Sequence, residues 1–237
     1  METGLLSILS VGFILGMKHA LEPDHVIAVS TIAGHSKKLW RSSLVGVFWG
    51  IGHTATLFLV GMFLILMKNE IPAKWAMSLE FLVGIMLAYL GITSMLSLRK
   101  RKIHVHEHEH SGFVHKHFHS HERIGSHDHT HQDVSYVKSM VIGLVHGLAG
   151  SAAMVLLAMA TVSSVWEGLA YILVFGAGTV VGMLCFTTMI AIPFVFTAKK
   201  EGINRTLTRI TGVISTAFGL YYMYNLGITE GLFKLWI

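Results

Sequence analysis

The sequence predicts an all-α integral membrane protein with six transmembrane helices, arranged as two inverted three-helix repeats with a disordered His-rich loop between them. Three observations lead to this fold class: an apolar composition, six long apolar runs and an internal repeat. Of the 237 residues, 53% are hydrophobic and only 13% are charged. A soluble domain carries about 25% charged residues, so the composition is typical of a membrane protein.

Each apolar run is long enough to cross a bilayer, which takes roughly 17–25 residues of helix. The first and fifth runs are longer than one crossing requires, so we expect each of them to be tilted, kinked or broken. The six predicted spans cover residues 5–34, 44–67, 76–98, 140–160, 168–196 and 207–226.

A weak internal repeat relates the two halves of the chain, span by span and in the same order. The matched pairs are Gly16/Gly143, His19/His146, Leu21/Leu148, Asp24/Ser151, Gly50/Gly176, Gly52/Gly178, His53/Thr179, Gly84/Gly212 and Gly91/Gly219. Because each half has three spans, the halves must insert with opposite orientations, an arrangement that recurs in secondary transporters. We therefore divide the chain into a first repeat (1–98), a His-rich loop (99–138) and a second repeat (139–237).

Basic residues predict the orientation in the membrane. Fourteen of the eighteen Lys and Arg residues lie in the loops after spans one, three and five, and the positive-inside rule makes such loops cytoplasmic. We expect a multi-pass protein of the plasma membrane, in contact with lipid, with both termini outside and the His-rich loop in the cytoplasm. Because these residues gather at the ends of spans, their charge does not indicate nucleic-acid binding.

The first span contains a cluster of titratable residues, His19-Ala-Leu-Glu22-Pro23-Asp24-His25. Ionisable groups at membrane depth are costly and point to function. On an ideal helix, His19, Asp24 and His25 would point about 0°, 140° and 240° around the axis and would not converge. Pro23 cannot donate to the His19 carbonyl and its ring clashes with that group. We therefore predict a kink or an unwound turn between residues 19 and 23, which re-aims the side chains and frees the His19 carbonyl as a further ligand.

Two more histidines lie in later spans, His53 within Gly52-His53-Thr54 and His146 in span four. Each is a candidate ligand, a partner that orients a ligand, or a polar residue that holds helices together. Imidazole nitrogen with carboxylate oxygen suits nickel, cobalt or zinc. The candidate metal ligands are His19, Glu22, Asp24, His25, His53 and His146. We predict no catalytic residue and no prosthetic group.

The loop between the halves contains eleven of the sixteen histidines, many of them alternating with another residue. A polar, low-complexity segment of this kind cannot build a core, so we expect it to be disordered. Short His-rich tracts commonly bind metal, which favours collecting, buffering or sensing ions. A simple spacer and a pH-responsive tail are the alternatives.

The motif of His19, Asp24 and His25 in one span, followed by Gly52-His53-Thr54 in the next, resembles the nickel/cobalt transporter family, and most of all its shorter six-span urease-accessory and metal-efflux relatives. The resemblance implies that His19, Asp24, His25 and His53 recognise the ion. The family usually has aspartate at the position of Glu22, alanine at that of Pro23 and serine at that of Thr54. Its later acidic signatures have no counterpart in the segment His146–Met154, HGLAGSAAM.

These observations predict a secondary transporter of divalent transition-metal ions, not an enzyme. The cargo is nickel or cobalt, with zinc as a further candidate, and the resemblance points to a cytoplasmic metallochaperone or a urease-maturation system as partner. The sequence is compatible with both uptake and export. Two alternatives stay open: a membrane haem or metal-cofactor protein that uses paired histidines such as His53 and His146, and a membrane-anchored metal buffer or sensor that acts through the loop.

Overall fold

The computed structural model describes residues 2–33, 38–67, 71–100, 104–110, 113–119, 135–161 and 164–237. Within these ranges the chain is mainly helical. The helices are α1 (Glu2–His19), α2 (Pro23–Ala33), α3 (Leu39–Met67), α4 (Ala73–Lys100), α5 (Tyr136–Thr161), α6 (Val165–Phe196) and α7 (Glu201–Tyr224). A π-helical turn (Asn225–Thr229) and a 3-10 turn (Leu232–Leu235) follow α7, and the strands are β1 (His104–His110) and β2 (Phe113–His119).

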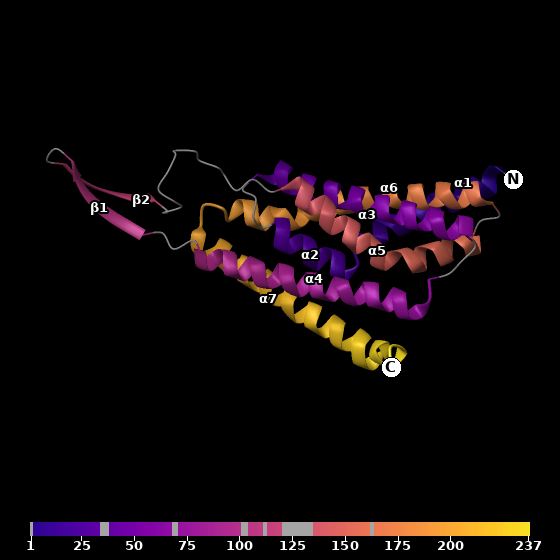
Figure 1. The fold of residues 1–237 in the computed structure, drawn as a ribbon. Helices are drawn as coiled ribbons and strands as arrows, with labels where there is room; N and C mark the ends of the chain where they lie inside the picture. The colour runs from indigo at the N-terminus through magenta and orange to yellow at the C-terminus, as the bar shows by residue number, and fades with distance from the viewer. Residues whose placement is uncertain are drawn as a thin grey trace.

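The helices lie side by side in an elongated bundle, and the β1–β2 hairpin projects from one end of it (Figure 1). Both termini lie toward the other end. In the bundle α1 packs against α6, α3 packs against both α5 and α6, and α4 packs against α7. The short helix α2 lies among them and contacts α3, α4, α6 and α7. Segments from both halves of the chain therefore surround the start of α2.

The helices have the length and composition of a membrane protein. In the described part of the chain, three are long and apolar enough to cross a bilayer: Leu39–Met67, Ala73–Leu98 and Val165–Phe196. Leu6–His19 and Tyr136–Ala149 are shorter apolar helices. Many large apolar side chains, among them Leu59, Phe63 and Met189, are exposed on the surface, as expected for a surface that contacts lipid tails.

Polar side chains inside the bundle bond neighbouring helices to one another. Thr54 Oγ1 on α3 donates to the Gly176 carbonyl on α6 at 3.1 Å, and Thr56 Oγ1 on the same helix donates to the Leu144 carbonyl on α5 at 3.0 Å. Ser215 Oγ on α7 donates to the Leu87 carbonyl on α4 at 2.8 Å. Such interhelical bonds, together with small residues at the contacts, are the usual means of helix association in lipid.

The two over-long runs behave differently. The first is divided into α1 and α2 by an irregular segment at residues 20–22, which confirms the predicted break. The fifth is one continuous helix, α6, with Pro193 in its last turn. A proline removes one backbone hydrogen bond of a helix. Because Pro193 lies in the last turn, little helix follows it that could be disrupted, and α6 does not break.

The hairpin departs from the disordered loop that the composition predicts. In its antiparallel register His104 pairs with His119, His106 with His117 and His108 with His115. The physical reason lies in the alternation of histidine with another residue, because a period of two is the pattern of a strand. Residues 101–103, 111–112 and 120–134, where the prediction also falls, lie outside the described residues.

Candidate metal site

The site is built around the break between α1 and α2. After α1 the backbone hydrogen bonds change from i→i−4 to i→i−3 spacing and form a turn. Leu21 N–H donates to the Lys18 carbonyl at 2.9 Å, and Glu22 N–H donates to the His19 carbonyl at 3.0 Å. Pro23 then opens α2, a position where its missing N–H costs nothing and its fixed φ suits a helix. The His19 carbonyl is therefore engaged by the Glu22 amide, which corrects our expectation that the break would free it as a ligand.

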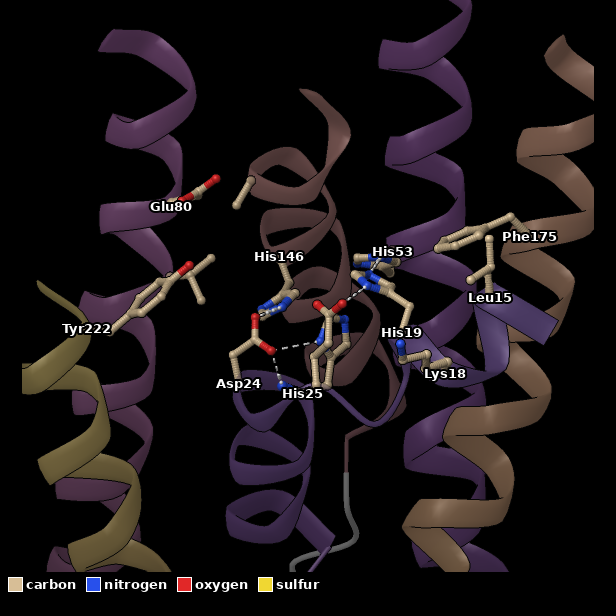
Figure 2. A pocket seen from close by; sticks show the side chains of 13 residues that line it. Leu15, Lys18, His19, Asp24, His25, His53, Glu80, His146, Phe175 and Tyr222 are labelled. Carbon is tan, nitrogen blue, oxygen red and sulfur yellow. Dashed lines mark hydrogen bonds and ion pairs between the residues drawn. The ribbon is translucent and has the colours of Figure 1, made fainter. Parts of the chain in front are cut away.

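A cavity of about 360 Å³ lies at this break. All six candidate ligands line it, which brings together the first span, α3 and α5. Figure 2 shows the four imidazoles and Asp24 grouped side by side at the start of α2. The remaining lining residues are Leu15, Lys18, Glu80, Val83, Ala149, Phe175 and Tyr222. Of these, Glu80 and Lys18 are charged residues that our predicted site does not include.

His19 links the break to α3. Its Nδ1 lies 2.9 Å from Glu22 Oε1, and its Nε2 lies 3.1 Å from His53 Nε2. A carboxylate on one ring nitrogen fixes the tautomer of a histidine and leaves the other nitrogen free to bind an ion. Glu22 is half exposed, with 52% of its side chain accessible, whereas His53 is buried. This geometry makes Glu22 a partner of His19 and directs Nε2 of His19 into the cavity.

Asp24 joins α2 to α5. Its Oδ1 accepts the backbone N–H of His25 at 2.9 Å and lies 3.1 Å from Nδ1 of the same histidine. Its Oδ2 lies 3.0 Å from His146 Nε2. Both oxygens of one carboxylate are therefore shared between imidazoles from two distant segments of the chain (Figure 2). The His25 and His146 rings meet edge to face, with centroids 4.2 Å apart.

Each of the three buried histidines in this cluster has one ring nitrogen without a partner in the described part of the chain. His25, His53 and His146 are each at most 3% exposed, and His25 Nε2, His53 Nδ1 and His146 Nδ1 have no hydrogen-bond partner among the described residues. Buried polar atoms are normally satisfied, so each exception needs an explanation. Two groups have the spacing of a metal site, with their ligand atoms within 4.8 Å of one another: His19, His25 and His53, and Asp24, His25 and His146.

Trp49 on α3 is a further residue of the site, which our reading of the sequence missed. It is fully buried, and its ring stacks on His25 at 5.7 Å and meets the edge of His146 at 5.5 Å. A signal for it exists, because residues four apart share one face of a helix and Trp49 precedes His53 by four. Gly143 makes room for it, since a Cβ at Gly143 would collide with the Trp49 backbone.

Comparison with known proteins identifies relatives of the whole chain. A family model described as "Cytochrome C biogenesis protein transmembrane region" matches residues 76–221. A urease accessory protein, UreH of Bacillus sp. (strain TB-90), is 62% identical over 100% of this chain and 99% of its own. A protein of Methanocaldococcus jannaschii that is named as a proposed nickel/cobalt efflux system is 28% identical over 88% of each chain.

A plant protein is a more distant relative. The chloroplast protein FOR GROWTH AND FERTILITY 1 of Arabidopsis thaliana is 26% identical over 92% of this chain and 59% of its own. No solved structure matches the chain. The matches to UreH and to the Methanocaldococcus jannaschii protein agree with the resemblance carried by the motifs of the first two spans. The chain therefore belongs to the family of UreH-type urease accessory proteins, among the shorter membrane relatives of the nickel/cobalt transporters.

Proposed function

We propose that this membrane protein is a secondary transporter of divalent transition-metal ions, and that its cargo is nickel, cobalt or both. The observation that carries the proposal is the convergence of four imidazoles and the Asp24 carboxylate on a single cavity at a broken helix, which the carboxylates of Glu22 and Glu80 also line. Irregular backbone at membrane depth is tolerated where it lines a cavity. A pathway for an ion requires such a cavity, whereas helix packing alone does not.

The donor atoms favour a transition metal over magnesium or calcium. Imidazole nitrogens outnumber carboxylate oxygens, and nitrogen-rich sets suit nickel, cobalt and zinc, whereas magnesium and calcium prefer oxygen. Nitrogens that share a tetrahedral ion at about 2.0–2.1 Å lie roughly 3.3 Å from each other. The 3.1 Å between His19 Nε2 and His53 Nε2 is close to that value. The pair needs little movement to bind one ion.

The names of two relatives support the same cargo. UreH is named as a urease accessory protein and the relative from Methanocaldococcus jannaschii as a proposed nickel/cobalt efflux system. From the first name we infer a partner system for this chain, the cytoplasmic maturation of urease. Only the second name states a direction, efflux, so the direction of transport by this chain has to be measured.

We further propose that the bundle consists of two inverted three-helix repeats, 1–98 and 139–237, that together make six spans. Glycine contacts between helices support this. Gly16 on α1 lies against the backbone of Phe175 on α6, and Gly143 on α5 lies against the backbone of Trp49 on α3. The repeat matches Gly16 with Gly143, and at an offset of 126 residues it matches Trp49 with Phe175. The contact of Gly16 with Phe175 is thus equivalent to that of Gly143 with Trp49, with the roles of the two halves exchanged.

The contact between α4 and α7 has the same reciprocity. Gly84 lies against the Gly219 carbonyl and Gly91 against the Gly212 carbonyl. The repeat matches Gly84 with Gly212 and Gly91 with Gly219. When residue i meets j and the equivalent of j meets the equivalent of i, the contact has the symmetry of a two-fold axis. A two-fold axis between the halves is what inverted repeats require.

We place the protein in the plasma membrane with its termini outside and residues 99–138 in the cytoplasm. The charge distribution supports this orientation, and Figure 1 is compatible with it because the hairpin and the termini lie toward opposite ends of the bundle.

The proposal is tested by nickel flux into proteoliposomes that contain the purified full-length chain. We expect flux of nickel and cobalt above that of empty liposomes, little flux of magnesium, and loss of the nickel flux in His19→Ala. Thr93→Ala is the matched control, because the Thr93 hydroxyl is exposed and bonds within its own helix. Equal flux in protein-containing and empty liposomes would contradict the proposal, and a Soret band in the purified protein would favour the haem alternative.

A further inference from the structure

His25 belongs to both candidate ligand groups. The first group, His19, His25 and His53, comes from the broken first span and α3, and all its donors are nitrogens. The second group, Asp24, His25 and His146, adds a carboxylate and reaches across to α5. Figure 2 shows the two groups next to each other, with His25 between His146 on one side and His19 and His53 on the other.

The two ring nitrogens of His25 face different groups. Nδ1 lies 3.1 Å from Asp24 Oδ1, within the second group. Nε2 points in another direction than Nδ1, because the outward directions of two ring nitrogens separated by Cε1 diverge widely, and it is buried with no partner among the described residues. The His25 ring lies 4.6 Å from that of His19 and 5.1 Å from that of His53, measured between centroids. Nε2 is therefore the donor available to the first group.

A neutral imidazole has one nitrogen with a free lone pair, because the other carries the proton. Neutral His25 can bind an ion in the first group through Nε2 or in the second group through Nδ1, but not in both at once. Resting on the transport function proposed above, we propose that the cavity holds one ion at a time at two alternating stations, and that the ion passes between them by exchanging the His25 nitrogen that binds it.

The protons balance without a change of net charge. With the ion at the first station, Nδ1–H of His25 and Nε2–H of His146 both donate to Asp24. With the ion at the second station, His25 binds through Nδ1 and its proton lies on Nε2, facing the released lone pairs of His19 and His53. His146 then binds through Nε2 and carries its proton on Nδ1, which is buried and unpartnered at present. No proton is gained or lost.

The second station has a mechanical consequence. Its ligands come from both proposed repeats, Asp24 and His25 from the first and His146 from the second, whereas the first station lies wholly in the first repeat. An ion at the second station therefore ties the two halves together, and an ion at the first does not. Differential contact of this kind is what allows a ligand to shift a conformational equilibrium, so movement between stations would be coupled to the rocking of the halves.

The test uses Co²⁺ as the probe, with the purified full-length chain in detergent and all eleven histidines of the loop (residues 99–138) replaced by serine to remove their binding. We expect one Co²⁺ per chain by equilibrium dialysis. His53→Ala and His146→Ala should each still bind one Co²⁺, within about a hundredfold of the parent affinity, through the station that is left. Their visible Co²⁺ spectra should differ from each other, and both should lose transport. His25→Ala should lose binding, since both stations need it.

Two Co²⁺ per parent chain would overturn the proposal, because both stations would then fill together. Loss of binding in both His53→Ala and His146→Ala would also overturn it, because it would indicate a single composite site. Size-exclusion chromatography identifies a variant that fails to fold, and His53→Gln and His146→Gln then replace the alanine variants. If the parent chain binds Co²⁺ as expected but transports no metal, the proposed function fails and not the two-station arrangement.

Discussion

The broken first span and helix α5 start from the same pattern and end in different structures. Each carries a glycine followed three residues later by a histidine, Gly16 with His19 and Gly143 with His146. In each, the glycine lies against the backbone of a neighbouring helix. The first span then breaks after His19 and restarts at Pro23, whereas α5 continues as one helix to Thr161.

The difference shows how a broken helix can bring several candidate ligands to one cavity. A continuous helix sends residues at i and i+5 to different faces, and among the described side chains of α5 that line the cavity, His146 and Ala149, only His146 is titratable. The break lets His19, Asp24 and His25 face the same cavity although they lie within seven residues of each other. Close packing is thus common to the two segments, and most of the candidate ligands lie in the first span.

The largest effect should come from removing the charge that links the two segments. We expect Asp24→Asn to lower nickel flux at least about 100-fold, because an amide can accept from only one of the two imidazoles and carries no charge for the ion. Flux into proteoliposomes measures this. Ser151→Ala, at the matched position of α5, is the control and should keep near-normal flux. Comparable losses in the two variants would mean that the segments contribute equally.

The glycine contacts should matter equally in the two segments. Gly16→Val and Gly143→Val would each drive a side chain into a neighbouring backbone, and overpacking of this kind costs about 1–3 kcal/mol. We expect lower thermal unfolding temperatures in detergent for both. Gly202→Val is the matched control, because nothing lies within 4 Å of a Cβ built there. A destabilisation confined to one of the two positions would argue against equivalent contacts.

A smaller effect is expected from the ring that supports His25 and His146. Trp49→Ala removes the stacked and edge contacts to these histidines, and partners that orient ligands contribute about 10–100-fold to metal affinity. We expect a rise of about tenfold in the nickel concentration that half-saturates flux, with Trp49→Phe closer to the parent because it retains a ring. An unchanged half-saturating concentration in Trp49→Ala would remove Trp49 from the site.

Much of the site could be predicted from the sequence, because its signals are local. Pro23 among titratable residues predicted the break. Their isolation in apolar spans made His53 and His146 candidate ligands, and the structure places both at the same cavity. The contact of one carboxylate with two imidazoles could not be predicted, because it depends on how α2 lies against α5. The engaged His19 carbonyl was missed for a similar reason: the turn at residues 20–22 supplies a donor that a straight helix would not. The hairpin was missed because the polar composition of the loop was given more weight than its alternation of histidine with another residue.

The smallest effect is expected from the loop. Deleting residues 104–131 should leave nickel flux at saturating metal within about twofold, because none of the described cavity residues lies in that segment. It should lower the number of ions bound per chain, since short His-rich tracts bind metal. Proteoliposome flux and equilibrium dialysis of the same preparation separate the two effects. Complete loss of flux would favour a buffer or sensor that acts through the loop.

The central claim is that a metal ion binds in the cavity through imidazoles supplied by the broken span. X-ray absorption at the nickel edge, on nickel-loaded protein lacking residues 104–131, tests this most directly. We predict a first shell of nitrogen and oxygen donors with the multiple-scattering signature of several imidazoles, and loss of that signature in His25→Ala. A nickel ion surrounded by water oxygens alone, or an imidazole signature that His25→Ala leaves unchanged, would contradict the account.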